Sequence, residues 1–113
     1  MIKIKTLTKI EKTALEEFNS ELLKKLGNNV VLIKLYGSKA RGDFHKGSDI
    51  DILVVLKKED KKARKIIYHL VTQLLLKYSI YLSVKIFSLT EYRYSSQLPT
   101  IFMDNVNREG IRL

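Results

Sequence analysis

The segment from Gly37 to Asp51 constrains the fold of this chain more than any other part of its sequence. It reads Gly-Ser-Lys-Ala-Arg-Gly-Asp-Phe-His-Lys-Gly-Ser-Asp-Ile-Asp and lies between two apolar runs, residues 30–36 and 50–56, that are typical of buried strands. A glycine directly after a strand allows the backbone to approach a ligand closely, and carboxylates at the start of the next strand provide metal ligands. The segment therefore predicts a pocket for a nucleoside triphosphate.

The acidic pair Asp49 and Asp51 opens the second apolar run. Residues two apart in a strand point to the same face, so both carboxylates project together while Ile50 and Ile52 turn to the other side. Two adjacent carboxylates repel each other unless a cation lies between them, and Mg²⁺ commonly binds one or two carboxylates together with substrate phosphates. We expect Asp49 and Asp51 to be catalytic metal ligands; the alternative is an exposed strand end that merely bounds a turn.

The glycine-serine pair before this loop is the candidate phosphate site. Gly37 permits a positive φ, and Ser38 offers a hydroxyl and a backbone N–H. If a helical turn opens at Ser38, its free N–H groups point toward an anion, and Arg41 adds a guanidinium that suits a phosphate. The alternative for Arg41 is a surface charge or an ion pair with Asp43 or Asp49.

The remaining sequence predicts helices around a small sheet. Thr8 and Glu11 have the spacing of a capping box, which predicts a helix that ends before Gly27. Apolar periodicity predicts a second long helix over residues 60–78. Weaker patterns predict a third strand over residues 80–88, a short helix over residues 90–96 and an apolar tail over residues 99–113. This order indicates an α/β or α+β domain with a small sheet packed against helices. The tail either packs on its own core or docks a partner.

Composition limits the classes of protein. The chain has 113 residues, no cysteine and a formal net charge of +9. The length predicts a single domain, residues 1–113, and the lack of cysteine excludes disulfides and thiolate metal sites. With no apolar run near the roughly 20 residues of a membrane span and no signal-peptide segment, we expect a cytoplasmic protein without a membrane partner. The positive charge favours an acidic partner, but the lysines are spread along the chain, which does not favour nucleic acid as a stable partner.

The composite motif resembles a known family. Gly37-Ser38, ten intervening residues and Asp49-x-Asp51 are similar to the signature of the DNA-polymerase-β-like nucleotidyltransferase superfamily, and the fuller form, with Gly-Ser-x-Ala-Arg-Gly and Ser-Asp-Ile-Asp-Ile-Leu-Val, resembles its minimal nucleotidyltransferase (MNT) branch. The resemblance implies a mixed sheet with flanking helices and a site in which Gly37, Ser38, Asp49 and Asp51 hold Mg²⁺ and ATP. It also implies transfer of a nucleotide to an acceptor hydroxyl with loss of pyrophosphate. MNT proteins are often antitoxins that add AMP to a HEPN ribonuclease toxin, so the resemblance implies a partner of that kind.

One departure from the family pattern concerns a third carboxylate on a later strand. The run of residues 80–88 has no Asp or Glu; Ser83 takes that position, and Lys85 shares its face. A hydroxyl is a poor metal ligand and a poor base, and an ammonium would repel a metal although it could contact a phosphate. Asp43 is a candidate substitute, and a role for His45 in the same loop is left open.

The resemblance, read together with these residues, leaves three functions open. The first is an Mg²⁺-dependent enzyme that transfers AMP from ATP to a protein partner, the second a nucleotide-binding antitoxin that acts by contact without turnover, and the third transfer to a small molecule or RNA. The intact pair of Asp49 and Asp51 favours the first, and the acid-free strand around Ser83 favours the second.

Overall fold

The computed structural model describes residues 5–42 and 49–113, and within them the fold is built on a four-stranded sheet of order β3-β2-β1-β4. Its strands are β1 (Val30–Tyr36), β2 (Ile50–Leu56), β3 (Leu82–Ser88) and β4 (Ile111–Arg112). β1 pairs antiparallel with β2 and β4, whereas β2 and β3 run parallel, so the sheet is mixed. The mixed α/β architecture that the sequence implied is confirmed.

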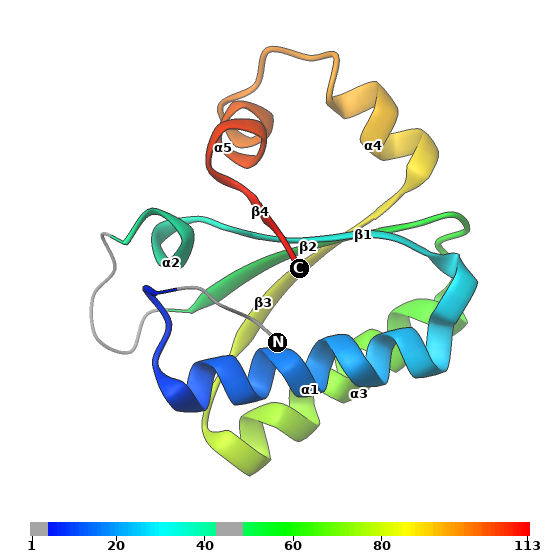
Figure 1. The fold of residues 1–113 in the computed structure, drawn as a ribbon. Coiled ribbons are helices and arrows are strands. Elements are labelled where there is room, and N and C mark those ends of the chain that lie inside the picture. The colour runs from blue at the N-terminus through cyan, green and yellow to red at the C-terminus, as the bar shows by residue number, and fades with distance from the viewer. Residues whose placement is uncertain (1–4, 43–48) are drawn as a thin grey trace.

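Two long helices cover one face of the sheet, α1 (Lys9–Leu26) and α3 (Lys61–Tyr78) (Figure 1). α1 begins with the predicted capping box, in which Thr8 Oγ1 accepts from the Glu11 N–H at 3.1 Å and the Thr8 N–H donates to Glu11 Oε1 at 2.8 Å. The apolar stripes of both helices pack on the inward side chains of β2, including Ile50 and Ile52, which are almost fully buried. This layer is the main core.

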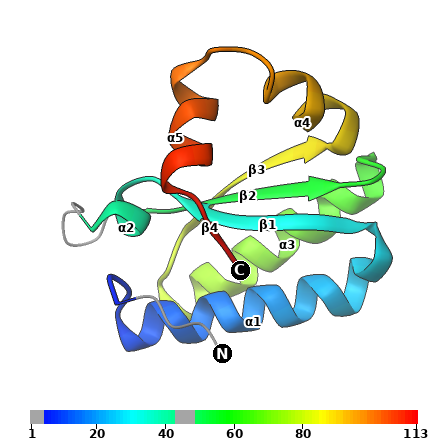
Figure 2. The ribbon, with the colours of Figure 1, turned by 45° about the horizontal axis from the view of Figure 1, so that its top comes forward.

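Two shorter helices cover the opposite face, α4 (Leu89–Ser95) and α5 (Ile101–Glu109) (Figure 2). They pack over a smaller apolar cluster whose fully or nearly buried members are Tyr36, Leu53, Val55 and Val106. The tail that the sequence left open thus packs on its own sheet, because α5 buries Val106 there and β4 then adds a strand beside β1. The third strand is shorter than predicted, since it begins at Leu82.

Two short helical turns complete the described elements: a 3₁₀ turn, η1 (Gly27–Asn29), and α2 (Ser38–Arg41), which directly follows β1 at one end of the sheet (Figure 1). Within residues 5–42 and 49–113, no helix combines the length and hydropathy that a membrane span requires.

Candidate active site

Three neighbouring side-chain positions lie in a row across the sheet, near the C-terminal end of β1 and the N-terminal end of β2. Asp51 of β2 is the register partner of Tyr36 on β1 and of Ser83 on β3. Since Ile50 and Ile52 face the core under α1 and α3, Asp51 faces the side covered by α5. Asp49 is exposed and directly precedes β2. Asp49 is therefore exposed just before the strand and Asp51 is half-buried within it, and their predicted role as metal ligands stays a prediction.

The turn after β1 brings Gly37, a candidate phosphate-binding residue, against Asp51. Gly37 has φ 77°, and a Cβ at this position would lie 2.4 Å from Asp51 Oδ2. Only glycine allows this approach, because a methyl group would displace the carboxylate. α2 then begins at Ser38, with the Ala40 and Arg41 N–H groups donating to the Gly37 carbonyl at 3.1 Å each. Gly37 and Asp51, far apart in the sequence, thus form one wall.

The electrostatics of Asp51 reflect its crowded position. Burial raises the pKa of its carboxyl, the Asp49 charge raises it further, and the charges of Lys85 and Arg41 lower it without cancelling the rise. A divalent cation beside both carboxylates would reverse the effect of their mutual repulsion. Two carboxylates beside open glycine backbone fit the small donor set that Mg²⁺ uses when phosphates supply further ligands.

The described part of the chain has no metal site with more ligating side chains than this pair of carboxylates. Among these residues, no group of three or more His, Cys, Asp or Glu side chains lies close enough to hold a metal ion. The register of Ser83 with Asp51 agrees with the position inferred from the sequence. Asp43 and His45 lie outside the described residues, so their predicted roles stay open.

Tyr36 lies beside Asp51 as its register partner on β1. Its side chain is buried, and its hydroxyl oxygen has no hydrogen-bond partner among the described residues. Burial and then the negative charge of Asp51 raise the pKa of Tyr36 to about 12, so the phenol stays protonated. Its ring packs edge-on against Phe102 of α5, with centroids 5.4 Å apart and planes at 88°. α5 therefore helps to set the shape of the site.

Arg41 lies close enough to affect Asp51, but its described ion-pair partner comes from α5. Arg41 Nη1 donates to Glu109 Oε2 at 3.0 Å. The sequence had suggested Asp43 or Asp49 as partners and gave no reason to consider Glu109. A phosphate at this site would compete with Glu109 for the guanidinium.

Sequence reasoning missed Lys39, the variable position of the Gly-Ser-x-Ala-Arg motif. Its ammonium lies 2.7 Å from Glu11 Oε2, with both side chains nearly buried, and the Thr6 hydroxyl donates to the Lys39 carbonyl. Burial alone would raise the pKa of Glu11, but the hydrogen bonds from Lys39 and from the Thr8 N–H outweigh it and the pKa is lowered. Lys39 thus fixes α2 to the start of α1, and no local sequence signal links these two residues.

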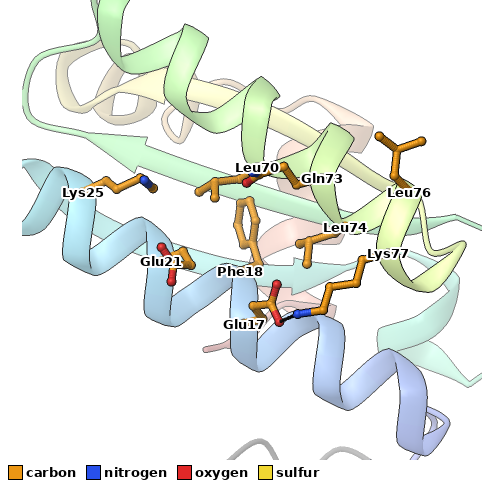
Figure 3. Close-up of a pocket in the computed structure, with 9 residues that line it drawn as sticks. All are labelled: Glu17, Phe18, Glu21, Lys25, Leu70, Gln73, Leu74, Leu76 and Lys77. Carbon is orange, nitrogen blue, oxygen red and sulfur yellow. Dashed lines mark hydrogen bonds and ion pairs between the residues drawn. The ribbon is translucent and has the colours of Figure 1, made fainter.

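A groove of about 570 Å³ lies elsewhere, between α1 and α3 (Figure 3). Phe18 and Leu74 line its floor, and the Lys77 ammonium reaches across it to Glu17 at 2.9 Å. Because α1 and α3 cover the face opposite to Asp51, this groove is separate from the candidate site.

Comparisons with known protein families agree with this geometry. A family model described as a nucleotidyltransferase domain matches residues 15–99. The Methanocaldococcus jannaschii protein named "Putative protein adenylyltransferase MJ0604" is 37% identical over 100 residues, which covers 88% of this chain and 94% of that protein. A second protein of the same organism, MJ0141, carries the same kind of name and is 31% identical over 101 residues, again 88% of this chain and 94% of its own length.

Solved structures share the fold. A toxin-antitoxin crystal structure with AMP-PNP matches with a TM-score of 0.54 and 26% identity, covering 86% of this chain and 70% of that one. A mutant of the toxin-antitoxin MntA-HpeT matches with a TM-score of 0.52 and 26% identity, over 87% and 70% of the two chains. With the family model spanning most of the sequence and the Gly37–Asp51 wall in place, this chain belongs to the nucleotidyltransferase domain family.

Proposed function

We propose that this nucleotidyltransferase is an Mg²⁺-dependent protein adenylyltransferase that transfers AMP from ATP to a hydroxyl of a HEPN-type toxin and thereby acts as its antitoxin in the cytoplasm. The observation that carries the proposal is the contact between the glycine turn and the acidic strand, where a Cβ at Gly37 would lie 2.4 Å from Asp51 Oδ2. This contact supports the proposal because a single triphosphate could reach both the Gly37 turn, as phosphate-binding backbone, and Asp51, as a metal ligand.

In this proposal each residue has a role that suits its position. Asp49 and Asp51 hold the cation, the Gly37 and Ser38 backbone faces the phosphates, and Arg41 neutralises phosphate charge after it leaves Glu109. When bound, Mg²⁺ would neutralise phosphate oxygens and polarise the phosphoryl group under attack. The acceptor oxygen bonds to the α-phosphorus as the bond to the bridging oxygen breaks and pyrophosphate leaves. The chain contributes mainly position and charge.

The partner is argued from the similar proteins. Two relatives that match over most of both chains are named as protein adenylyltransferases, and the similar solved structures are toxin-antitoxin complexes, one of them with AMP-PNP. Within the described residues, the short elements around the site leave no obvious acceptor-recognition subdomain. Acceptor specificity therefore falls to a partner surface.

A second function, an antitoxin that acts by contact without turnover, is favoured by one observation. Ser83 stands in register with Asp51, where the family pattern has a third carboxylate. In that case the chain binds ATP and silences its partner without transferring AMP.

A labelling experiment separates these functions. The purified chain is incubated with Mg²⁺, α-labelled ATP and an extract of the source cells, beside Asp51→Asn and the matched surface variant Asp104→Asn. Label on a protein with the wild type and Asp104→Asn, but not with Asp51→Asn, supports the proposal. Label on RNA moves the acceptor class to nucleic acid, and ATP binding without any label favours the contact antitoxin.

A further inference from the structure

The position opposite Asp51 on β3 carries no charge. Ser83 is the register partner of Asp51, and the parallel ladder continues with Lys85 opposite Leu53. Residues two apart in a strand share a face, so Ser83 and Lys85 lie on the same face as Asp51. The strand has no acidic residue in its span, Leu82–Ser88. A neutral hydroxyl adds no charge to bind a second divalent cation, so the described carboxylates suit one ion.

Lys85 brings a fixed positive charge to this side of the site. Its ammonium lies 5.7 Å from the centroid of the Phe102 ring on α5, so the side chain extends over the sheet toward that helix. Lys85 also lies two residues beyond Ser83, the register partner of Asp51, on the same face of the sheet. In the described part of the chain, no salt bridge is formed by Lys85. The ammonium is therefore available to an anion next to Asp51.

An aromatic cluster holds this ammonium in place. The Phe102 ring packs edge-on against Tyr36 at 5.4 Å and against Phe87 at 6.1 Å, measured between ring centroids. Tyr36 in turn is the register partner of Asp51. The quadrupole of an aromatic ring attracts a cation over its face, which favours this orientation of the Lys85 side chain. A chain of neighbouring side chains thus connects the ammonium to the carboxylate, in the order Lys85, Phe102, Tyr36 and Asp51.

We propose that the Lys85 ammonium takes the place of a second divalent cation, so that the site works with one Mg²⁺ and with Lys85 as a phosphate-binding residue. This inference rests on the proposed function. As the acceptor oxygen bonds to the α-phosphorus and the bond to pyrophosphate breaks, the leaving group takes the electron pair, the hydroxyl proton passes to water, and Lys85 stays protonated. A lysine is a compact point charge that suits this task without a proton transfer of its own.

Binding measurements test the inference without relying on turnover. Mn²⁺ replaces Mg²⁺, and its stoichiometry is measured by electron paramagnetic resonance with a non-hydrolysable ATP analogue. The wild type is expected to bind one Mn²⁺ per chain, and Lys85→Met is expected to weaken analogue binding about tenfold, the loss of one charge-assisted contact. Lys65→Met, an exposed lysine of α3 on the other side of the sheet, is the matched control and should bind like the wild type.

The double variant Ser83→Asp/Lys85→Ala completes the test, because restoring the carboxylate and removing the ammonium should let a second Mn²⁺ bind. Two Mn²⁺ ions per wild-type chain, or unchanged analogue affinity in Lys85→Met, would overturn the inference while leaving the proposed function intact. If Mn²⁺ binding instead survives Asp51→Asn unchanged, the metal site itself is wrong and the proposed function fails with it.

Discussion

The Lys39 ammonium and the Glu11 carboxylate form a buried ion pair at 2.7 Å, with side chains 3% and 8% exposed. Through it, α2, the turn that we propose to bind phosphate, is joined to the first turn of α1. Such a pair is weak evidence for net stability, but loss of the carboxylate removes the nearest opposite charge from a nearly buried ammonium.

Glu11→Gln is therefore expected to lower the free energy of unfolding by about 3 kcal/mol, measured by urea denaturation at neutral pH. The pKa of Glu11 is lowered in the folded state, so the ionised carboxylate stabilises the fold above the ordinary carboxyl value of 4.5. This contribution to the free energy of unfolding is lost as pH falls through the folded pKa. The difference between Glu11→Gln and the wild type should thus shrink in acid. The double variant Glu11→Leu/Lys39→Met should recover most of the loss, and failure to recover would mean that the pair itself, not the unpaired charge, matters.

Gly37→Ala tests the approach of the turn to the acidic strand. The new methyl group would meet Asp51 Oδ2 at 2.4 Å on a backbone with φ 77°, so Asp51 must move. We expect loss of Mn²⁺-dependent ATP-analogue binding by tenfold or more, together with destabilisation of about 1–2 kcal/mol. Gly27→Ala is the matched control, because Gly27 also has a positive φ, 43°, but no atom within 4 Å of the added Cβ. Equal effects of both variants on binding would contradict the assigned contact.

Asp51→Asn should stabilise the fold while it removes function. Burial and the Asp49 charge raise the pKa of Asp51 in the folded state, so the folded state binds more protons than the unfolded state. The free energy of unfolding therefore falls as pH rises from the unfolded pKa of Asp51 through its folded pKa. At neutral pH the uncharged amide avoids the unfavourable burial of a negative charge beside Asp49, so the melting temperature should rise by a few degrees. The gain should disappear below the ordinary value of 3.8. A lower melting temperature at pH 7 would show that Asp51 is stabilised by its neighbours instead.

Glu109→Gln should remove one competitor of phosphate for the Arg41 guanidinium. The Arg41–Glu109 pair at 3.0 Å is partly exposed, and pairs of this kind contribute up to about 1 kcal/mol. We expect ATP-analogue affinity to rise about two- to fivefold in calorimetric titrations. Asp104→Asn, which breaks the surface pair of Asp104 with Arg108 on the same helix, should leave affinity unchanged. Weaker binding in Glu109→Gln would mean that Glu109 positions Arg41 instead of competing for it.

The sequence predicted the regular elements around the site well, for physical reasons that are local. The bounds of β1 and β2 are those of the two apolar runs, since a glycine and an acidic residue mark their ends at Gly37 and Asp49. The capping box at Thr8 fixed the start of α1. The family resemblance placed Ser83 at the position of a third carboxylate, and the structure pairs Ser83 in register with Asp51.

The rest depends on tertiary contacts that leave no local signal. α5 is short and partly polar, and β4 has only two residues, so their order comes from packing on Tyr36 and pairing with β1. The ion pairs of Lys39 with Glu11 and of Arg41 with Glu109 join residues far apart in sequence. Periodicity and spacing report on neighbours along one element and are silent on such pairs.

The most direct test of the central claim is the intact mass of a purified HEPN-type partner after incubation with this chain, Mg²⁺ and ATP. The account predicts that the partner gains the mass of AMP with the wild type and with Asp104→Asn, and gains nothing with Asp51→Asn. A partner that binds the wild-type chain and ATP yet keeps its mass, or one that gains AMP with Asp51→Asn, would contradict it.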